Sequence, residues 1–234
     1  MPSAFVKHLQ NQAAAFENVD GVQLMLASFK RTVDFKEALE NERNKINADP
    51  NLSVTGKAEK VRELVQKHAH EAIRAQLTAK ELANAIDSRK SKLKLPSSNE
   101  TNVAAALLRG QIRDRFAKMG SLAERKVALA TETDPVTIEA ILEGPASLSG
   151  LDNATRDEVR SKAIATHFPD QIARIQRDQE AAQIARFAAD DLAETMADAV
   201  GIPKNSFGEF LQAAVPDRRH LEADALRTAE PLAT

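Results

Sequence analysis

The chain has 234 residues, of which 41 are alanine, and its formal net charge at pH 7 is −2. Cysteine is absent, which excludes disulfide bonds and thiolate zinc sites, and the near-neutral charge argues against a general polyanion binder. Leu, Ile, Val and Phe together number 55 residues, about 24% of the chain. So few bulky side chains favour closely spaced helices that need partner chains to bury enough surface.

Ala, Leu, Glu, Gln, Lys and Arg dominate the composition, and these are the strong helix formers. We therefore expect an all-α, elongated multi-helix protein. No apolar run approaches the ~20 residues that span a bilayer, and residues 1–10 lack the apolar core of a signal peptide. The sequence predicts no membrane span and no secretion by a signal peptide. We expect a cytoplasmic protein, or one incorporated into a virion.

Apolar residues at helical spacing predict helices over residues 3–19 and 22–47, and the second ends at the Asn-Ala-Asp-Pro-Asn stretch at 47–51. A longer helix follows over about 56–94. The sequence Leu-Pro-Ser-Ser-Asn at 95–99 predicts a linker over 96–102. It would separate an N-terminal long-helix hairpin or bundle (1–95) from a C-terminal helical domain (103–234).

Shorter helices follow the linker. Ser121 and Asp134 have the pattern of residues that cap helix N-termini, and Thr155 begins a second capping-box pattern. The first helix of this region, about 100–119, is expected to turn five apolar side chains inward: Leu107, Leu108, Ile112, Phe116 and Met119.

A second long helix is predicted over about 170–200. Its apolar residues alternate in steps of three and four, the pattern of a coiled-coil seam, which polar Gln179 and Arg186 interrupt. We expect this seam to contact a partner helix. Its members are Phe168, Ile172, Ile175, Ala182, Ala189, Met196 and Val200.

The same helix carries Asp190, Glu194 and Asp198 at successive steps of four, so that like charges share one face. One interpretation is a solvated ridge. The other is an acidic face that docks against a basic surface, such as the N-terminal helices of another copy, where complementary charge would select the partner.

Two histidines, His68 and His70, lie in the third predicted helix. Because each helical residue turns about 100°, they are expected about 160° apart, with His68 near the apolar stripe and His70 in solvent. The helical zinc pattern needs His at position 74, where the chain has Arg74. The pair therefore does not predict a metal or catalytic site.

Residues 191–214 resemble a helix-turn-helix: Ala197 precedes Gly201 by four positions, and Phe207 and Phe210 hold the inward positions of a second helix. The charge of the segment 190–215 opposes DNA binding, which depends on cations at phosphates. The segment contains five acidic residues and one lysine, a net charge of −4: Asp190, Asp191, Glu194, Asp198 and Glu209 against Lys204.

No sequence motif predicts a catalytic residue, a cofactor or a metal site. We interpret the chain as a non-enzymatic structural or adaptor subunit of a larger protein assembly, such as part of a viral particle or a bacterial scaffold. Its partners would be proteins, copies of itself included. The alternatives are a helix-turn-helix DNA-binding regulator using residues 191–214 and a helical-bundle enzyme whose acid–base groups converge from separate helices.

Overall fold

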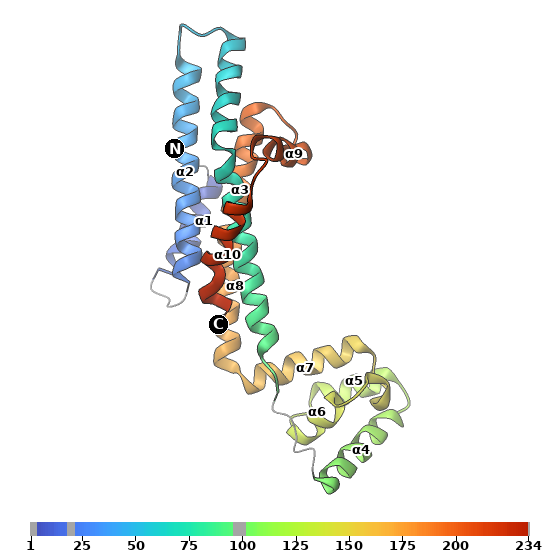
Figure 1. Cartoon of the computed structure of the whole chain (residues 1–234). Coiled ribbons are helices and arrows are strands. Elements are labelled where there is room, and N and C mark those ends of the chain that lie inside the picture. Colours follow the sequence, from blue (N-terminus) through green and yellow to red (C-terminus); the bar gives the residue numbers. More distant parts are fainter. Residues whose placement is uncertain (1–3, 18–21, 96–101, 234) are drawn as a thin grey trace. The chain divides into compact units, whose positions relative to one another are not determined.

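The structure, a computed structural model, describes residues 4–17, 22–95 and 102–233, and within these ranges it contains helices and no strand (Figure 1). The prediction of an all-α fold with two long helices is confirmed. In the described part of the chain the helices are α1 (Ala4–Ala14), α2 (Gln23–Ala48), α3 (Val54–Lys92), α4 (Val103–Ala117), α5 (Leu122–Ala130), α6 (Pro135–Leu142), the 3₁₀ helix η1 (Ala146–Ser149), α7 (Asn153–His167), α8 (Pro169–Val200), α9 (Lys204–Ala214) and α10 (Arg219–Ala233).

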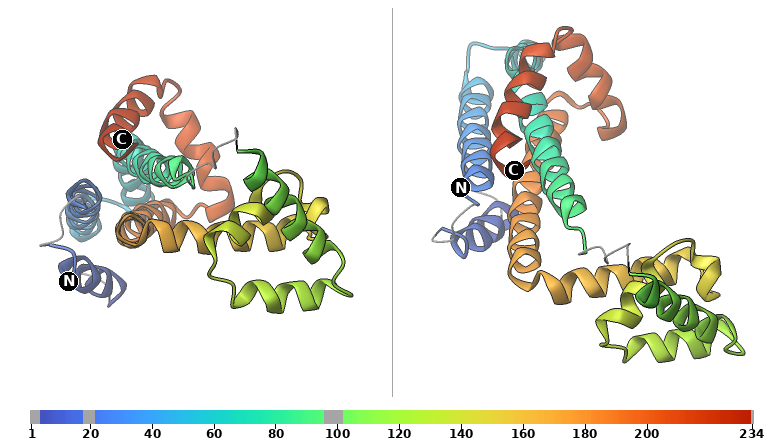
Figure 2. Two further views of the ribbon diagram at one scale, coloured as in Figure 1. Left: turned by 90° about the horizontal axis from the view of Figure 1, so that it is seen from below. Right: turned by 60° about the horizontal axis from the view of Figure 1, so that its bottom comes forward.

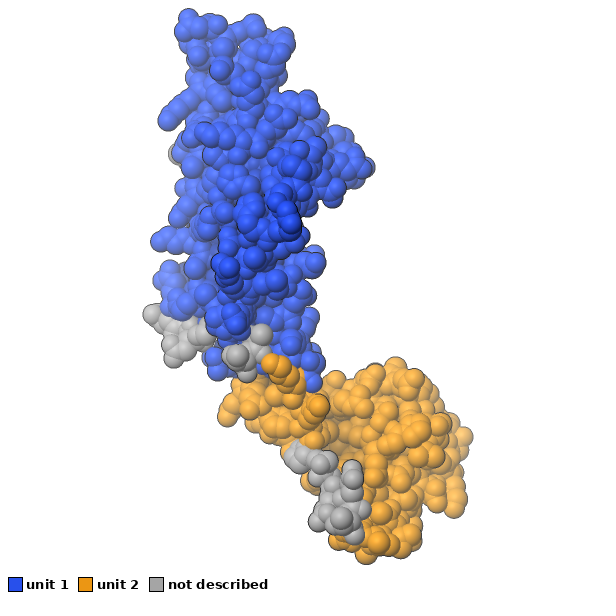
Figure 3. Space-filling view, viewed as in Figure 1, with its two compact units in different colours: residues 1–91, 173–234 blue, residues 92–172 orange. Residues whose placement is uncertain are grey.

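The helices form two compact units (Figure 3). Unit 1 comprises residues 1–91 and 173–234, and unit 2 comprises residues 92–172. This division differs from the one expected from chain order, which assigned residues 173–234 to the C-terminal domain. The difference arises because α8 buries its side chains against α2 and α3 of the N-terminal segment. The predicted linker spans 96–102; residues 96–101 lie outside the described residues, and Asn102 caps α4.

Unit 1 is built on a hairpin of α2 and α3, joined by residues 49–53, with α8 running antiparallel to α3 (Figures 1 and 2). The Lys57 ammonium donates to the Asn47 carbonyl oxygen at 2.8 Å and joins the two helices near their connection. In the last turn of α3, the Arg89 guanidinium pairs with the Asp178 carboxylate and links α3 to α8. Asp178 is buried, and its second carboxylate oxygen has no hydrogen-bond partner.

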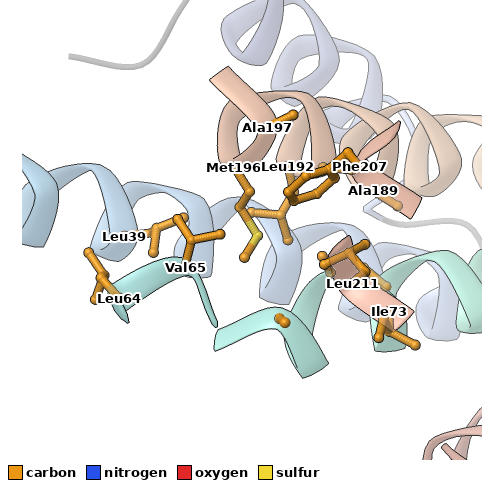
Figure 4. Close-up of a cluster of buried hydrophobic side chains, with 14 of the residues drawn as sticks. Leu39, Leu64, Val65, Ile73, Ala189, Leu192, Met196, Ala197, Phe207 and Leu211 are labelled. Atoms are coloured by element: carbon orange, nitrogen blue, oxygen red, sulfur yellow. The ribbon is translucent and has the colours of Figure 1, made fainter. Parts of the chain in front are cut away.

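The main core of unit 1, which we call the central cluster, contains side chains from α2, α3, α8, α9 and α10 (Figure 4). Bulky members such as Val65, Met196 and Phe207 meet at one end of α8. Alanines fill much of the rest, as at Ala72 and Ala189. Because the separation of packed helices depends on the side chains between them, alanine permits α3 and α8 to approach closely.

A second cluster joins α1 and α2 to another face of α8, through Leu9, Phe29, Val33 and Ile184 among others. Two sides of α8 are therefore buried within unit 1. The buried Lys36 ammonium of α2 also pairs with the Asp191 carboxylate of α8, at 2.6 Å. Such a pair contributes little net free energy, but removing one partner would leave an uncompensated buried charge.

The Arg125 side chain connects several elements of unit 2. The Arg125 guanidinium donates to the carbonyl oxygens of Phe116 (2.7 Å), Ala117 (3.0 Å), Met119 (2.6 Å) and Gly150 (2.8 Å). Two of these oxygens belong to the last turn of α4, where a cation also meets the negative end of the helix dipole. This side chain joins α4, α5 and the turn after η1.

Sequence patterns located most helix starts in unit 2, but two expectations are wrong. Ser121 forms the predicted capping box and Asp134 caps α6, whereas α7 begins earlier than Thr155 because Asp152 caps it. The second error concerns α4. Phe116 is buried as expected, but Leu107 and Leu108 are exposed, because only the C-terminal half of α4 packs on the core of unit 2.

Candidate functional site

The two histidines of α3 each contact a neighbouring side chain of the protein. The rings of His68 and Phe35 are 5.4 Å apart between centroids, and burial lowers the pKa of His68. His70 is half-buried, and its Nε2 lies 3.3 Å from the Glu71 carboxylate. His68 therefore acts as a packed, neutral ring near pH 7.

The predicted seam of α8 is largely occupied within the chain. Ile175, Ala182, Ala189 and Met196 are buried in unit 1, while Val200 is half-buried and packs on the central cluster. Phe168 and Ile172 are half-buried and belong to unit 2. The buried members are covered by this chain's own helices, so a partner would have to contact another surface of a folded copy.

The predicted acidic face is on the surface. Asp190, Glu194 and Asp198 are all exposed, and we call these three residues the acidic ridge. The Lys204 ammonium lies 2.5 Å from the Glu194 carboxylate, and the Arg186 guanidinium lies 3.8 Å from that of Asp190. Both pairs are exposed and therefore weak. Three carboxylates against two cations leave the ridge with one negative charge.

The segment 191–214 folds as two helices joined by a tight turn. Gly201 has φ = 67°, and backbone bonds from Ile202 to Ala197 and from Gly201 to Asp198 close the end of α8 in a Schellman motif. Phe207 is buried in the central cluster. The inward positions expected from the resemblance are thus used for packing.

The outer face of α9 would contact DNA in a helix-turn-helix protein. It exposes Asn205, Ser206, Glu209 and Gln212, and Lys204, the one cation of α9, is paired with Glu194. Guanine is read mainly by Arg or Lys, and phosphates attract cations. This face therefore lacks the charge on which DNA binding depends.

The first two turns of α4 expose apolar side chains, which sequence reasoning did not anticipate. Val103 is 73% exposed, Leu107 65% and Leu108 49%, and the alanines at 104 and 106 are also exposed. We call residues 103–108 the α4 apolar face. A surface helix normally turns polar residues outward, so this face lacks the expected pattern. The sequence clue was a run of six consecutive apolar residues, 103–108.

The C-terminal half of α4 is anchored by ion pairs to Glu143. The Glu143 carboxylate accepts from Arg113 at 2.6 Å and from Arg109 at 3.1 Å, and Arg109 is buried. The hydrogen bond from Arg113 is the largest influence that lowers the pKa of Glu143. These bonds fix the orientation of α4, so its apolar face is presented on an anchored helix.

A groove in unit 1 gathers arginines from three helices. A cavity of about 460 Å³ lies between α2, α3 and α10, with Leu192 of α8 in its wall. Arg31, Arg74 and Arg227 line it, together with Glu71 and Asp224. We call it the arginine groove. Because its arginines are distant in sequence, no local pattern could have indicated it.

Across residues 4–17, 22–95 and 102–233, no group of three or more His, Asp or Glu side chains is placed to hold a metal ion. No helix in the same ranges is long and apolar enough to cross a membrane. Comparison with family models, curated proteins and solved structures finds no match.

Proposed function

We propose that the chain is a non-enzymatic structural or adaptor subunit of a larger protein assembly, and that copies of itself are among its partners. The observation that carries the proposal is the α4 apolar face. Covering one leucine fully is worth about 1.5–3 kcal/mol, and this face exposes two leucines and a valine on adjacent turns. Apolar side chains grouped in this way mark binding surfaces, whereas single ones are ordinary.

Gly110 supports the same interpretation. It lies inside α4, where glycine costs about 1 kcal/mol relative to alanine. A Cβ atom built at this position would meet nothing within 4 Å, so packing within the chain does not require the glycine. It shares the outward side of α4 with Leu107 and Val103, which are three and seven positions away. A closely approaching partner helix would make use of the missing side chain.

The composition supports an assembly of the kind found in a viral particle or a bacterial scaffold, working in the cytoplasm or within a virion. A DNA-binding regulator is the alternative for residues 191–214. The tight turn and the buried Phe207 favour a stable two-helix unit, but the outer face of α9 lacks free cations. We therefore prefer the assembly role.

Sedimentation velocity tests the proposal over a range of protein concentrations up to about 1 mM, where binding free energies near −4 kcal/mol become visible. We expect species larger than a monomer. The Leu107→Glu variant places a charge on the α4 apolar face and should weaken association at least about 30-fold, equivalent to about 2 kcal/mol. A wild-type chain that stays monomeric over the whole range would overturn the proposal.

Val54→Glu is the matched control, because Val54 is also an exposed apolar residue but begins α3 in unit 1. It should sediment as the wild type does. Both positions are exposed, so neither substitution disturbs the core, and circular dichroism should show unchanged helicity.

A further inference from the structure

The arginines of the arginine groove offer hydrogen-bond donors to a partner. Arg74 donates to Glu71 at 2.7 Å, and Arg31 lies 3.3 Å from the same carboxylate. Arg227 lies 3.7 Å from Asp224, beyond a hydrogen bond. The Arg31 and Arg227 side chains are 60% and 78% exposed, so a partner can reach both. Three guanidinium groups against two carboxylates leave one positive charge.

Guanidinium groups suit carboxylates, because their planar fork can donate two parallel hydrogen bonds to one carboxylate. The groove therefore fits a surface that presents several carboxylates in a row. Its wall also contains the half-buried Phe35, which would contact the carbon atoms of such side chains. Acidic side chains on successive turns of a helix have this form.

The acidic ridge of α8 is such a surface. Its three carboxylates recur every four residues, and it retains one negative charge beside its two exposed ion pairs. The charges of the ridge and the groove are thus opposite. Complementary charge of this kind determines which partner binds and in which orientation.

The ridge cannot reach the groove of its own chain. Leu192 lines the groove, and Asp190 and Glu194 each lie two residues from it, about 160° around the helix axis. The ridge and the groove therefore lie on opposite sides of α8 within unit 1. Contact between them requires two copies.

We propose that the acidic ridge of one copy docks in the arginine groove of a second copy. The contact is head-to-tail, so the first copy keeps a free groove and the second a free ridge, and association continues into a ring or a filament. The inference rests on the proposed assembly function but uses different residues, in unit 1 instead of unit 2.

Two charge-reversal variants test the contact by sedimentation velocity. The groove variant carries Arg31→Glu and Arg227→Glu, and the ridge variant carries Asp190→Lys and Glu194→Lys. Each variant alone should no longer form the largest species, and its copies should bind one another at least about tenfold more weakly. An equimolar mixture should recover these species, because each variant then meets an opposite charge on the other. Association of the wild type through this contact should weaken with salt.

A control variant with Lys60→Glu and Lys80→Glu changes the net charge equally at two exposed positions of α3 outside the groove, and it should behave as the wild type. The inference is overturned if the groove and ridge variants assemble normally, or if their mixture does not recover assembly. If Leu107→Glu alone prevents association, the inference fails and the proposed function stands. If the wild-type chain does not associate at any concentration, both the inference and the proposed function are overturned.

Discussion

Replacing Arg125 by methionine should destabilise unit 2 selectively. Methionine keeps the apolar stem but removes every donor to the four carbonyl oxygens that Arg125 joins. The bonds to Phe116, Met119 and Gly150 are partly buried, and each is worth about 1 kcal/mol once water compensates. Losing the cation at the end of α4 adds about 0.5 kcal/mol. We expect a loss of about 3–4 kcal/mol in the unfolding free energy of unit 2.

Hydrogen exchange is the suitable assay, because the chain lacks Trp and Tyr for fluorescence. Amides of α4, α5 and α7 should lose protection, while those of α3 in unit 1 keep theirs. Arg125→Lys should be intermediate, because one ammonium cannot reach all four carbonyls. Arg160→Met removes an exposed ion pair and should cost less than about 0.5 kcal/mol. Equal loss of protection in both units, or a loss below about 1 kcal/mol, would refute this reasoning.

Three further substitutions have definite expected results. Gly150→Ala should lower the unfolding free energy of unit 2 by about 1–3 kcal/mol, because φ is 66° there and a Cβ would lie 2.9 Å from Arg125 Cζ. At Gly208 an added Cβ would meet nothing within 4 Å, so Gly208→Ala should instead stabilise α9. Equal effects of the two substitutions on hydrogen exchange would contradict both expectations. Met196→Ala should destabilise unit 1 by about 2–5 kcal/mol in urea denaturation followed by circular dichroism, since Met196 is fully buried; an unchanged midpoint would contradict this. Burial lowers the pKa of His68 below 6.5, so the unfolded state binds more protons below that pH. Stability should therefore fall as pH drops below about 6.5 and level off below the folded-state pKa, and His68→Gln should remove this dependence in thermal melts.

The sequence predicted local features of this fold well. The pattern of α8 placed a helix over 170–200, and the structure has Pro169–Val200. The Ser121 capping box and the Asp134 cap follow from hydrogen bonds within a few residues, so short patterns contain them. Such features depend only on neighbours in the chain.

Contacts across long sequence separations were not predictable. The pair of Lys36 with Asp191 joins residues 155 positions apart, and no local pattern relates them. Periodicity also shows that a helix has an apolar stripe without showing what covers it, so it predicts a core position for Leu107, which is exposed. The arginine groove is a third case, because its arginines come from three separate helices.

Side-chain footprinting with hydroxyl radicals tests the central claim most directly, because it measures whether Leu107 and Leu108 are covered by another chain. Wild-type protein would be labelled in dilute and in concentrated solution, with the exposed Val54 as internal reference. We predict that both leucines react more slowly at high concentration while Val54 reacts at the same rate. Equal rates for the leucines at both concentrations would contradict the account.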